Sequence, residues 1–163
     1  MDKMPILAVI FQGIPESIVV YCFGMAIVGE YINFKRILIA SIITPFLMMF
    51  VRSVVPVFGI HIIIGIFILF ILFWSLMKLD IKKAIISSIL SMSILTLLEI
   101  LIYSTLFKLV DTSYAQAYNN LFQRILLPYV VIISYTIITF LIYHFKLPLI
   151  KGKRINNEQE IFN

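Results

Sequence analysis

Cysteine and histidine are scarce in this chain of 163 residues. Cys22 is the only cysteine, which excludes an internal disulfide and a metal site built on paired cysteines. The two histidines, His61 and His144, lie far apart and lack the HExxH spacing of a zinc-dependent intramembrane protease. We therefore expect no metal site and no cofactor.

Charged residues are also scarce, at 13% of the chain, while 62% of the residues are hydrophobic and the mean hydropathy is +1.09. In a soluble domain about a quarter of the residues are charged, and so much Ile, Leu and Phe would form large apolar patches in water. A bilayer solvates these side chains, so the composition indicates an integral membrane protein. The net charge of +5 does not indicate nucleic-acid binding, because Lys and Arg lie between and after the apolar runs rather than on one cationic face.

Five apolar runs approach the length that a helix needs to cross the hydrocarbon core, which is about 20 residues. They extend over Ile6–Val28, Ile37–Val55, Ile60–Met77, Ala84–Phe107 and Ile125–Phe145. Pro56 and Gly59 favour a tight turn between the second and third runs. The sequence predicts an all-α bundle of about five transmembrane helices, with one domain over residues 1–150 and a short tail over 151–163.

Positive charge is distributed unequally between the two sides that these runs would define. The side with more cations holds nine of them: Lys35, Arg36, Lys78, Lys82, Lys83, Lys146, Lys151, Lys153 and Arg154. The other side holds four: Lys3, Arg52, Lys108 and Arg124. Because cytoplasmic loops carry an excess of Lys and Arg, the bias predicts an outer N-terminus and a cytoplasmic C-terminus.

The longest outer link, residues 108–124, has a helical pattern of its own. Ser113 and Gln116 match a capping box. Apolar and aromatic residues then recur at helical spacing: Tyr114, Tyr118, Leu121, Phe122 and Ile125. We expect a short amphipathic helix on the outer surface, either anchored among the headgroups or acting as a lid or ligand contact.

The first apolar run contains polar groups that lipid would not solvate. Gln12 and Glu16 are four residues apart and share a helix face, which Val9, Val20 and Phe23 continue. We expect this face to turn inward, because a carboxylate exposed to lipid is costly.

Gly13 and Pro15 predict a kink or an unwound turn in the same run. Pro15 has no backbone N–H, so the carbonyl of Phe11 loses its helical donor, and Gly13 weakens the turn further. The freed carbonyl therefore requires a donor from protein or water.

Three more ionisable residues are expected near this turn. Glu99 lies in the middle of the fourth run, Arg52 is the only basic residue well inside a run, and His61 opens the next one. Glu99 continues a mostly polar helix face formed by Ser88, Met92, Thr96 and Tyr103. At about 1.5 Å per residue, the two acids fall at similar depths, within reach of a long arginine side chain. The candidate ligand-binding or coupling residues are Gln12, Glu16, Arg52, His61 and Glu99.

Two interpretations of these residues remain open. In the structural one, Arg52 and one carboxylate form a buried pair that fixes the helix register, and the other carboxylate is protonated. In the functional one, the group lines a pocket open to the outside, where it binds a polar or charged ligand or exchanges protons.

Small and hydroxyl-bearing residues predict helix contacts elsewhere. Ser87 and Ser91 form a small-xxx-small pattern that indicates close approach of another helix. Tyr129, Thr136 and Tyr143 recur at seven-residue intervals, with Thr139 nearby, and we interpret them as a packing stripe rather than as ligand contacts.

Three stretches carry a resemblance to a known family: FQGIPESIVV at 11–20, VRSVVPVFGIHIIIGIFILFILFWSLMKLDIKKAIISSIL at 51–90 and LLPYVVIISYTIITFLIYHF at 126–145. Nearly all of residues 1–150 resembles the membrane-embedded N-terminal sensor region of bacterial histidine kinases with a GHKL-type ATPase domain, akin to accessory-gene-regulator and sporulation sensors. The positions that carry the pattern are Gly13, Pro15, Glu16, Arg52, Pro56, Gly59 and His61.

The resemblance implies a protein of the bacterial cell membrane that receives an external or membrane signal and passes it on through its last helix. Only 13 residues follow Ile150, without a phosphoacceptor helix or Gly-rich ATP-binding boxes, so we expect no kinase activity. Nor do the acids have a nucleophile, metal set or phosphate-binding loop beside them, and we expect a protein that is not an enzyme.

Two functions are compatible with these features. The first is a sensory or regulatory protein that responds to a small molecule or peptide and pairs with a histidine kinase, another membrane protein or a second copy of itself. The second is a small transporter or a substrate-binding subunit of a transport complex, because broken helices near the midplane are typical of transporters. No internal repeat supports the second function.

Overall fold

The computed structural model describes residues 6–54, 60–110, 121–145 and 147–149, and nearly all of these residues are helical. The elements are α1 (Ile6–Ala8), the π-helix η1 (Val9–Gly13), α2 (Ile14–Ile27), α3 (Phe34–Val54), α4 (Ile60–Ser75), α5 (Ile81–Val110) and α7 (Leu121–His144). The described part of the chain contains no strand. The predicted all-α class is therefore confirmed.

Three helical segments in the described ranges are long and apolar enough to cross a membrane: Val9–Ile27, Phe34–Val54 and Ile81–Leu106. The apolar segments Ile60–Ser75 and Pro128–His144 are shorter. The 16 residues of α4 rise about 24 Å, which is less than a hydrocarbon core of about 30 Å. Length and composition thus confirm three of the five predicted spans, and the orientation across a membrane stays a prediction.

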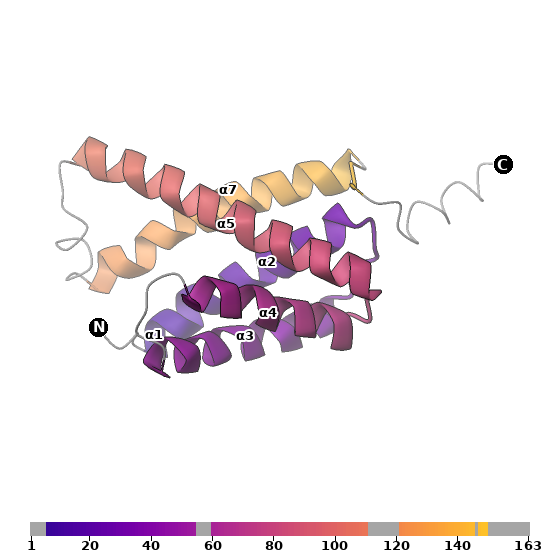
Figure 1. Cartoon of the computed structure of the whole chain (residues 1–163). Helices are drawn as coiled ribbons and strands as arrows, with labels where there is room; N and C mark the ends of the chain where they lie inside the picture. Colours follow the sequence, from indigo (N-terminus) through magenta and orange to yellow (C-terminus); the bar gives the residue numbers. More distant parts are fainter. Residues whose placement is uncertain (1–5, 55–59, 111–120, 146, 150–163) are drawn as a thin grey trace.

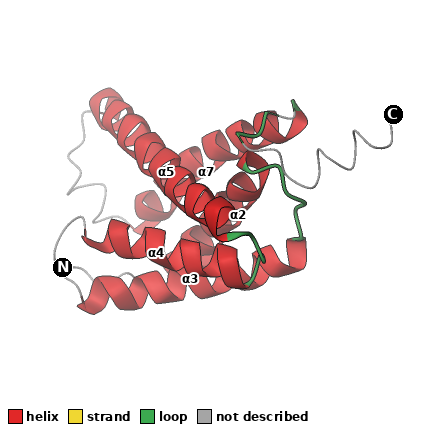
Figure 2. Cartoon of the chain, turned by 45° about the vertical axis from the view of Figure 1, so that its right-hand side comes forward, coloured by secondary structure: helices red, strands yellow, loops and turns green. Residues whose placement is uncertain are grey.

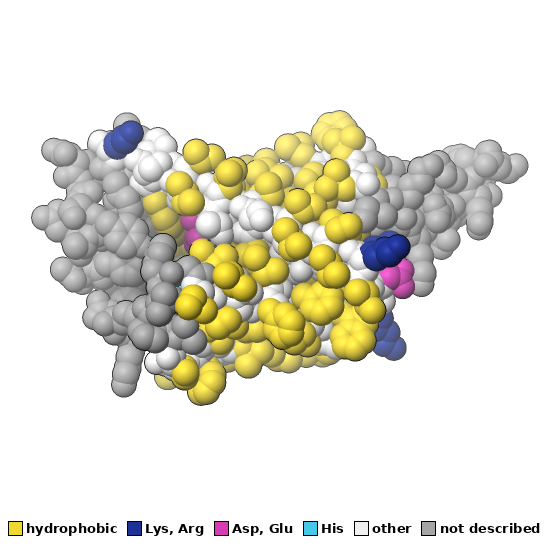
Figure 3. All heavy atoms as spheres, in the orientation of Figure 1, with side chains coloured by type: hydrophobic (Ala, Val, Ile, Leu, Met, Phe, Trp, Pro, Cys, Tyr) yellow, Lys and Arg dark blue, Asp and Glu magenta, His cyan; other side chains and the backbone are white. Residues whose placement is uncertain are grey.

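Helix α2 lies at the centre of the bundle and packs against α3, α5 and α7 (Figure 1). In Figures 1 and 2, α3 and α4 lie side by side. Helices α5 and α7 cross each other, above α3 and α4 in the view of Figure 1. Successive long helices run in opposite directions, so the links 28–33 and 76–80 fall at the same end of the bundle, which we call the lysine end. The face in Figure 3 is apolar along its middle, and its Lys and Arg side chains lie towards the two ends.

The helix ends on both sides of the short link between α2 and α3 are capped. The N–H groups of Gly29 and Glu30 donate to the carbonyls of Ala26 and Met25, each at 3.1 Å, in the pattern of a Schellman motif. Gly29 has a φ of 64°, a left-handed conformation that glycine adopts without a steric penalty. At the start of α3, the Asn33 side-chain oxygen accepts a hydrogen bond from the N–H of Arg36 at 3.3 Å.

Two aromatic pairs hold α2 in the core. The Tyr21 ring meets Phe73 of α4 edge-on, with centroids 5.0 Å apart, and Phe23 contacts Tyr135 of α7 at 4.9 Å. The Thr44 hydroxyl donates to the Ala40 carbonyl at 2.8 Å, so the Tyr21 hydroxyl donates to the Thr44 oxygen at 2.6 Å. These buried hydroxyls are thus satisfied inside the bundle, as an apolar surrounding requires.

The closest approach of α2 to α5 occurs at Gly24. The Ser87 hydroxyl donates to the Gly24 carbonyl at 2.9 Å, and a Cβ added to Gly24 would lie 3.0 Å from the Ser91 oxygen. Ser87 and Ser91 are both fully buried. The small-xxx-small prediction is confirmed.

The predicted packing stripe on α7 is wrong at Thr136 and Tyr143, whereas its residue Thr139 is buried as expected. Thr136 and Tyr143 are exposed, whereas Val131, Tyr135 and Thr139 are buried. The Thr136 hydroxyl donates to the Ile132 carbonyl within its own helix at 2.7 Å, so it needs no neighbouring helix.

Several predicted features lie outside the described residues. They are Pro56 and Gly59 of the expected turn, residues 113–120 of the expected outer helix, and the tail 151–163. The last positions of that outer helix, Leu121, Phe122 and Ile125, belong to the first turns of α7.

A comparison of two glycines tests the α2 crossing. A Cβ at Gly24 would overlap the Phe73 ring, which is fully buried and packed against the Tyr21 ring. Gly24→Ala should therefore lower the free energy of unfolding in detergent by about 1–3 kcal/mol. The matched control is Gly65→Ala, whose Cβ would meet only the flexible Met48 and Met92 side-chain ends at 3.3 and 3.4 Å. An equal loss in the two variants would contradict this account of the crossing.

Candidate functional site

The first long helix is interrupted at the position that Gly13 and Pro15 predict. Residues 9–13 form a single π-helical stretch, and Pro15 lies in the first turn of α2. Such π-bulges occur frequently at functional sites. A Cβ on Gly13 would lie 2.7 Å from the Cβ of Pro45 in α3, so a side chain here would push the two helices apart. The interruption is therefore packed against protein.

The Phe11 carbonyl receives a hydrogen bond from another helix. The hydroxyl of Tyr129 in α7 donates to this oxygen at 2.6 Å. This is the carbonyl that Pro15, four residues later, leaves without its helical donor. The prediction that the freed carbonyl needs a donor is confirmed, and the donor lies 118 residues away in the sequence.

The two predicted intramembrane acids interact electrostatically beside this interruption. Glu16 interacts electrostatically with Glu99 of α5 and with Arg52 of α3, and its side chain is hydrogen-bonded to Gln12. Glu99 also interacts with Arg52. Both carboxylates are half-buried, and Val9, Val20 and Phe23 of the same face are buried, so the expected inward orientation is confirmed. We call Gln12, Glu16, Arg52 and Glu99 the acid cluster.

The remaining predicted site residue, His61, lies in the first turn of α4 and is half-buried. Arg52 lies in the last turn of α3 and is exposed, at the same end of the bundle as His61. Both side chains interact with neighbouring groups. That His61 acts together with the acid cluster stays a prediction.

Tyr135 is a neighbour of the acid cluster that the sequence did not single out. It interacts electrostatically with Glu16, and its hydroxyl donates to the Ser91 carbonyl at 3.0 Å. Tyr135 is fully buried between α2 and α5. Its only sequence signal was its place among apolar residues four positions before Thr139, which is also buried.

The charges of the acid cluster do not balance. When both carboxylates are ionised, Arg52 neutralises one of them and a net charge of about −1 remains. A proton or the cationic group of a ligand would neutralise the second carboxylate. Within the described ranges, no three His, Cys, Asp or Glu side chains are grouped to hold a metal ion.

A buried ion pair at the lysine end was also missed by the sequence analysis. The Lys83 Nζ lies 2.5 Å from Glu30 Oε1, and the two side chains are 16% and 12% exposed. The pair joins the α2–α3 link to the start of α5. Its sequence signal was weak: Glu30 is the lone acid of a basic link, and Lys83 was counted only for orientation.

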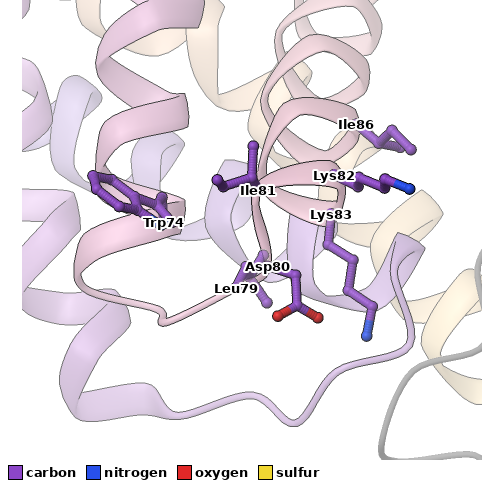
Figure 4. Close-up of a pocket in the computed structure, with 7 residues that line it drawn as sticks. All are labelled: Trp74, Leu79, Asp80, Ile81, Lys82, Lys83 and Ile86. Carbon is purple, nitrogen blue, oxygen red and sulfur yellow. The ribbon is translucent and has the colours of Figure 1, made fainter.

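A shallow hollow of about 720 Å³ lies at the lysine end, away from the acid cluster (Figure 4). Its lining residues are Trp74, Leu79, Asp80, Ile81, Lys82, Lys83 and Ile86. The hollow therefore includes the α4–α5 link and the first turns of α5.

Comparisons of the chain with protein-family models, with curated proteins and with solved structures gave no match.

Removing the Tyr129 hydroxyl tests its role at the π-helix. Tyr129→Phe leaves the Phe11 carbonyl without this donor and should lower the free energy of unfolding by about 1 kcal/mol. It should also speed amide hydrogen exchange in residues 9–16. Ser134→Ala is the control on the same helix, because the Ser134 hydroxyl donates only to its own Val130 carbonyl. Unchanged exchange in Tyr129→Phe would show that the hydroxyl does not stabilise the interruption.

A double-mutant cycle measures the ion pair at the lysine end. Lys83→Met and Glu30→Gln should each destabilise the protein, because each leaves a partly buried polar partner unpaired. The coupling energy between the two changes should be about 1–3 kcal/mol in detergent unfolding. Additive effects of the two substitutions would show that the pair contributes nothing beyond its separate side chains.

Proposed function

We propose that this chain is an integral membrane protein with five membrane-crossing helices, an outer N-terminus and a cytoplasmic C-terminus. The apolar middle of the face in Figure 3 and the unequal numbers of Lys and Arg in the sequence segments between and after the apolar runs support this arrangement. The two shorter apolar segments are extended by adjacent residues of the chain. Residues 76–77 follow the end of α4, and α7 begins at Leu121, seven residues before its apolar segment starts at Pro128.

Within that membrane protein, we propose a sensory or regulatory role without enzymatic activity. The observation that carries the proposal is the acid cluster, in which two half-buried carboxylates on otherwise apolar helices interact electrostatically with one guanidinium. Ionisable groups at such depth are costly and are usually functional. The unbalanced charge makes the cluster sensitive to a proton or to the cationic group of a small molecule or peptide.

The packing of α2 against α7 provides a route from the acid cluster to the C-terminal segment. Tyr129 binds the Phe11 carbonyl near one end of the pair, and Phe23 contacts Tyr135 in the middle. At the lysine end, the N–H of Leu149 donates to the Ile27 carbonyl at 2.8 Å. A displacement of the turn that carries Glu16 would therefore shift α7 and the residues that follow it.

The proposed receiver of this displacement is another membrane protein. A histidine kinase with a similar membrane region is the first candidate, on the resemblance of residues 1–150, and a second copy of this chain is another. The protein would modulate the partner by pairing with its membrane helices.

A second candidate function is transport. The interrupted helix beside two acids favours this role, because discontinuous helices bind substrates and protons in secondary transporters. In that case the protein, alone or in a transport complex, would bind and move a substrate in a proton-dependent way.

Crosslinking from native membranes separates these functions. The wild-type chain should capture a histidine kinase, and Glu16→Gln and Arg52→Ala should reduce the captured amount severalfold while inserting normally. Lys108→Ala is the matched control, since it removes an exposed cation of the same side that is not part of the acid cluster. Capture of a transport complex, or proton-linked substrate uptake into vesicles without any captured kinase, would overturn the sensory role and favour transport.

A further inference from the structure

The α4–α5 link places cations at the edge of an apolar face. Lys78 and Lys82 are exposed, and Trp74 in the last turn of α4 is 51% exposed. In Figure 4, Ile81 lies between the Trp74 ring and the side chains of Lys82 and Lys83. Trp74, Ile81 and Lys82 line the shallow hollow at the lysine end, and Lys78 precedes its lining residue Leu79 in the chain.

An exposed apolar stripe leads away from this link along α5. Ile81, Ile85 and Ile89 are four residues apart, so they share one helix face, and their exposed fractions are 55%, 41% and 45%. Because α5 starts at Ile81, the stripe extends from the lysine end into the apolar middle of the protein. Cations beside the start of an apolar stripe match an amphiphile, whose charged headgroup is joined to a hydrocarbon chain.

The charge of the link is positive after its ion pair is taken into account. Lys83 is paired with Glu30, so its charge is balanced. Lys78 and Lys82 outnumber the exposed carboxylate of Asp80, so the link and the first turn of α5 together have a net charge of about +1. The complementary headgroup is therefore an anion.

The backbone at Lys78 provides an independent observation. Lys78 has a φ of 56°, the left-handed conformation that is strained for a residue with a Cβ and costs glycine nothing. A lysine thus occupies a position where the turn itself favours glycine. Such outliers justify a search for a function of the side chain.

We propose that the α4–α5 link binds the headgroup of an anionic phospholipid. Lys78 and Lys82 contact the phosphate, Trp74 lies at the headgroup level, and an acyl chain follows Ile81, Ile85 and Ile89. The site depends on the membrane insertion proposed above but is independent of the sensory role. A lysine near an anionic surface changes lipid affinity about fivefold, and salt weakens the effect.

The single tryptophan of the chain, Trp74, makes the site directly measurable. The full chain is reconstituted in phosphatidylcholine bilayers that contain equal fractions of either dibrominated phosphatidylglycerol or dibrominated phosphatidylcholine, and quenching of Trp74 fluorescence is recorded. The brominated anionic lipid should associate about fivefold more strongly. This preference should disappear in the double variant Lys78→Gly/Lys82→Gln, whose glycine also relieves the strained turn. Lys108→Gln, at the other end of α5, should keep it.

Each other outcome overturns the proposal in a distinct way. Equal quenching by the two lipids, or a preference that persists in the double variant, would exclude the lysine site. A preference that added inorganic phosphate abolishes would assign the lysines to a soluble anion instead. Failure of both brominated lipids to quench Trp74 would contradict membrane insertion itself, and the lipid site would fall with it. If the double variant Lys78→Gly/Lys82→Gln fails to fold, the variant Lys78→Arg/Lys82→Arg takes its place. It keeps both charges, so it should retain the preference for the anionic lipid, and a lost preference would contradict the proposal.

Discussion

The hydrogen bond from the Tyr129 hydroxyl to the Phe11 carbonyl satisfies the constraint on which the rest of the structure depends. In an apolar surrounding, every backbone group that leaves a helical ladder needs another partner. Pro15 and the π-helix disrupt the ladder of the first helix, and α7 provides the hydroxyl that compensates. The interruption beside Glu16 is therefore stable only while α7 is packed against α2, which makes the acid cluster and the last helix parts of one structural unit.

The same constraint explains the other polar contacts of the bundle. The Tyr21 hydroxyl reaches Thr44, the Ser87 hydroxyl reaches the Gly24 carbonyl, and Lys83 reaches Glu30, each across two different elements. Lipid tails are as apolar as leucine, so burial of apolar side chains does little to specify which helices pack together. Directional hydrogen bonds and the small residue at Gly24 supply that specificity, and they involve α2 or the link that follows it.

Patterns within one helix were predictable from the sequence, whereas partners from distant helices were not. The break at Gly13 and Pro15 and the inward face of Glu16 follow from local chemistry. The donor to Phe11 and the Glu30–Lys83 pair depend on which helices become neighbours, and no periodicity specifies this. The α7 stripe failed for a related reason: a hydroxyl at Thr136 is as well satisfied by its own helix as by a neighbour, so a row of hydroxyl residues does not mark a packing face.

The number of acids in the cluster argues against a role in helix register alone. One carboxylate is enough to pair with Arg52 and to hold α3 against its neighbour. Glu16 and Glu99 both interact with Arg52, and they also repel each other when both are ionised. A second acid thus adds desolvation and repulsion without adding a structural partner, and an amide at either position would avoid these costs while keeping hydrogen bonds. A surplus carboxylate whose charge changes, through a proton or a cationic ligand, has the property that the proposed sensor or a proton-coupled transporter requires.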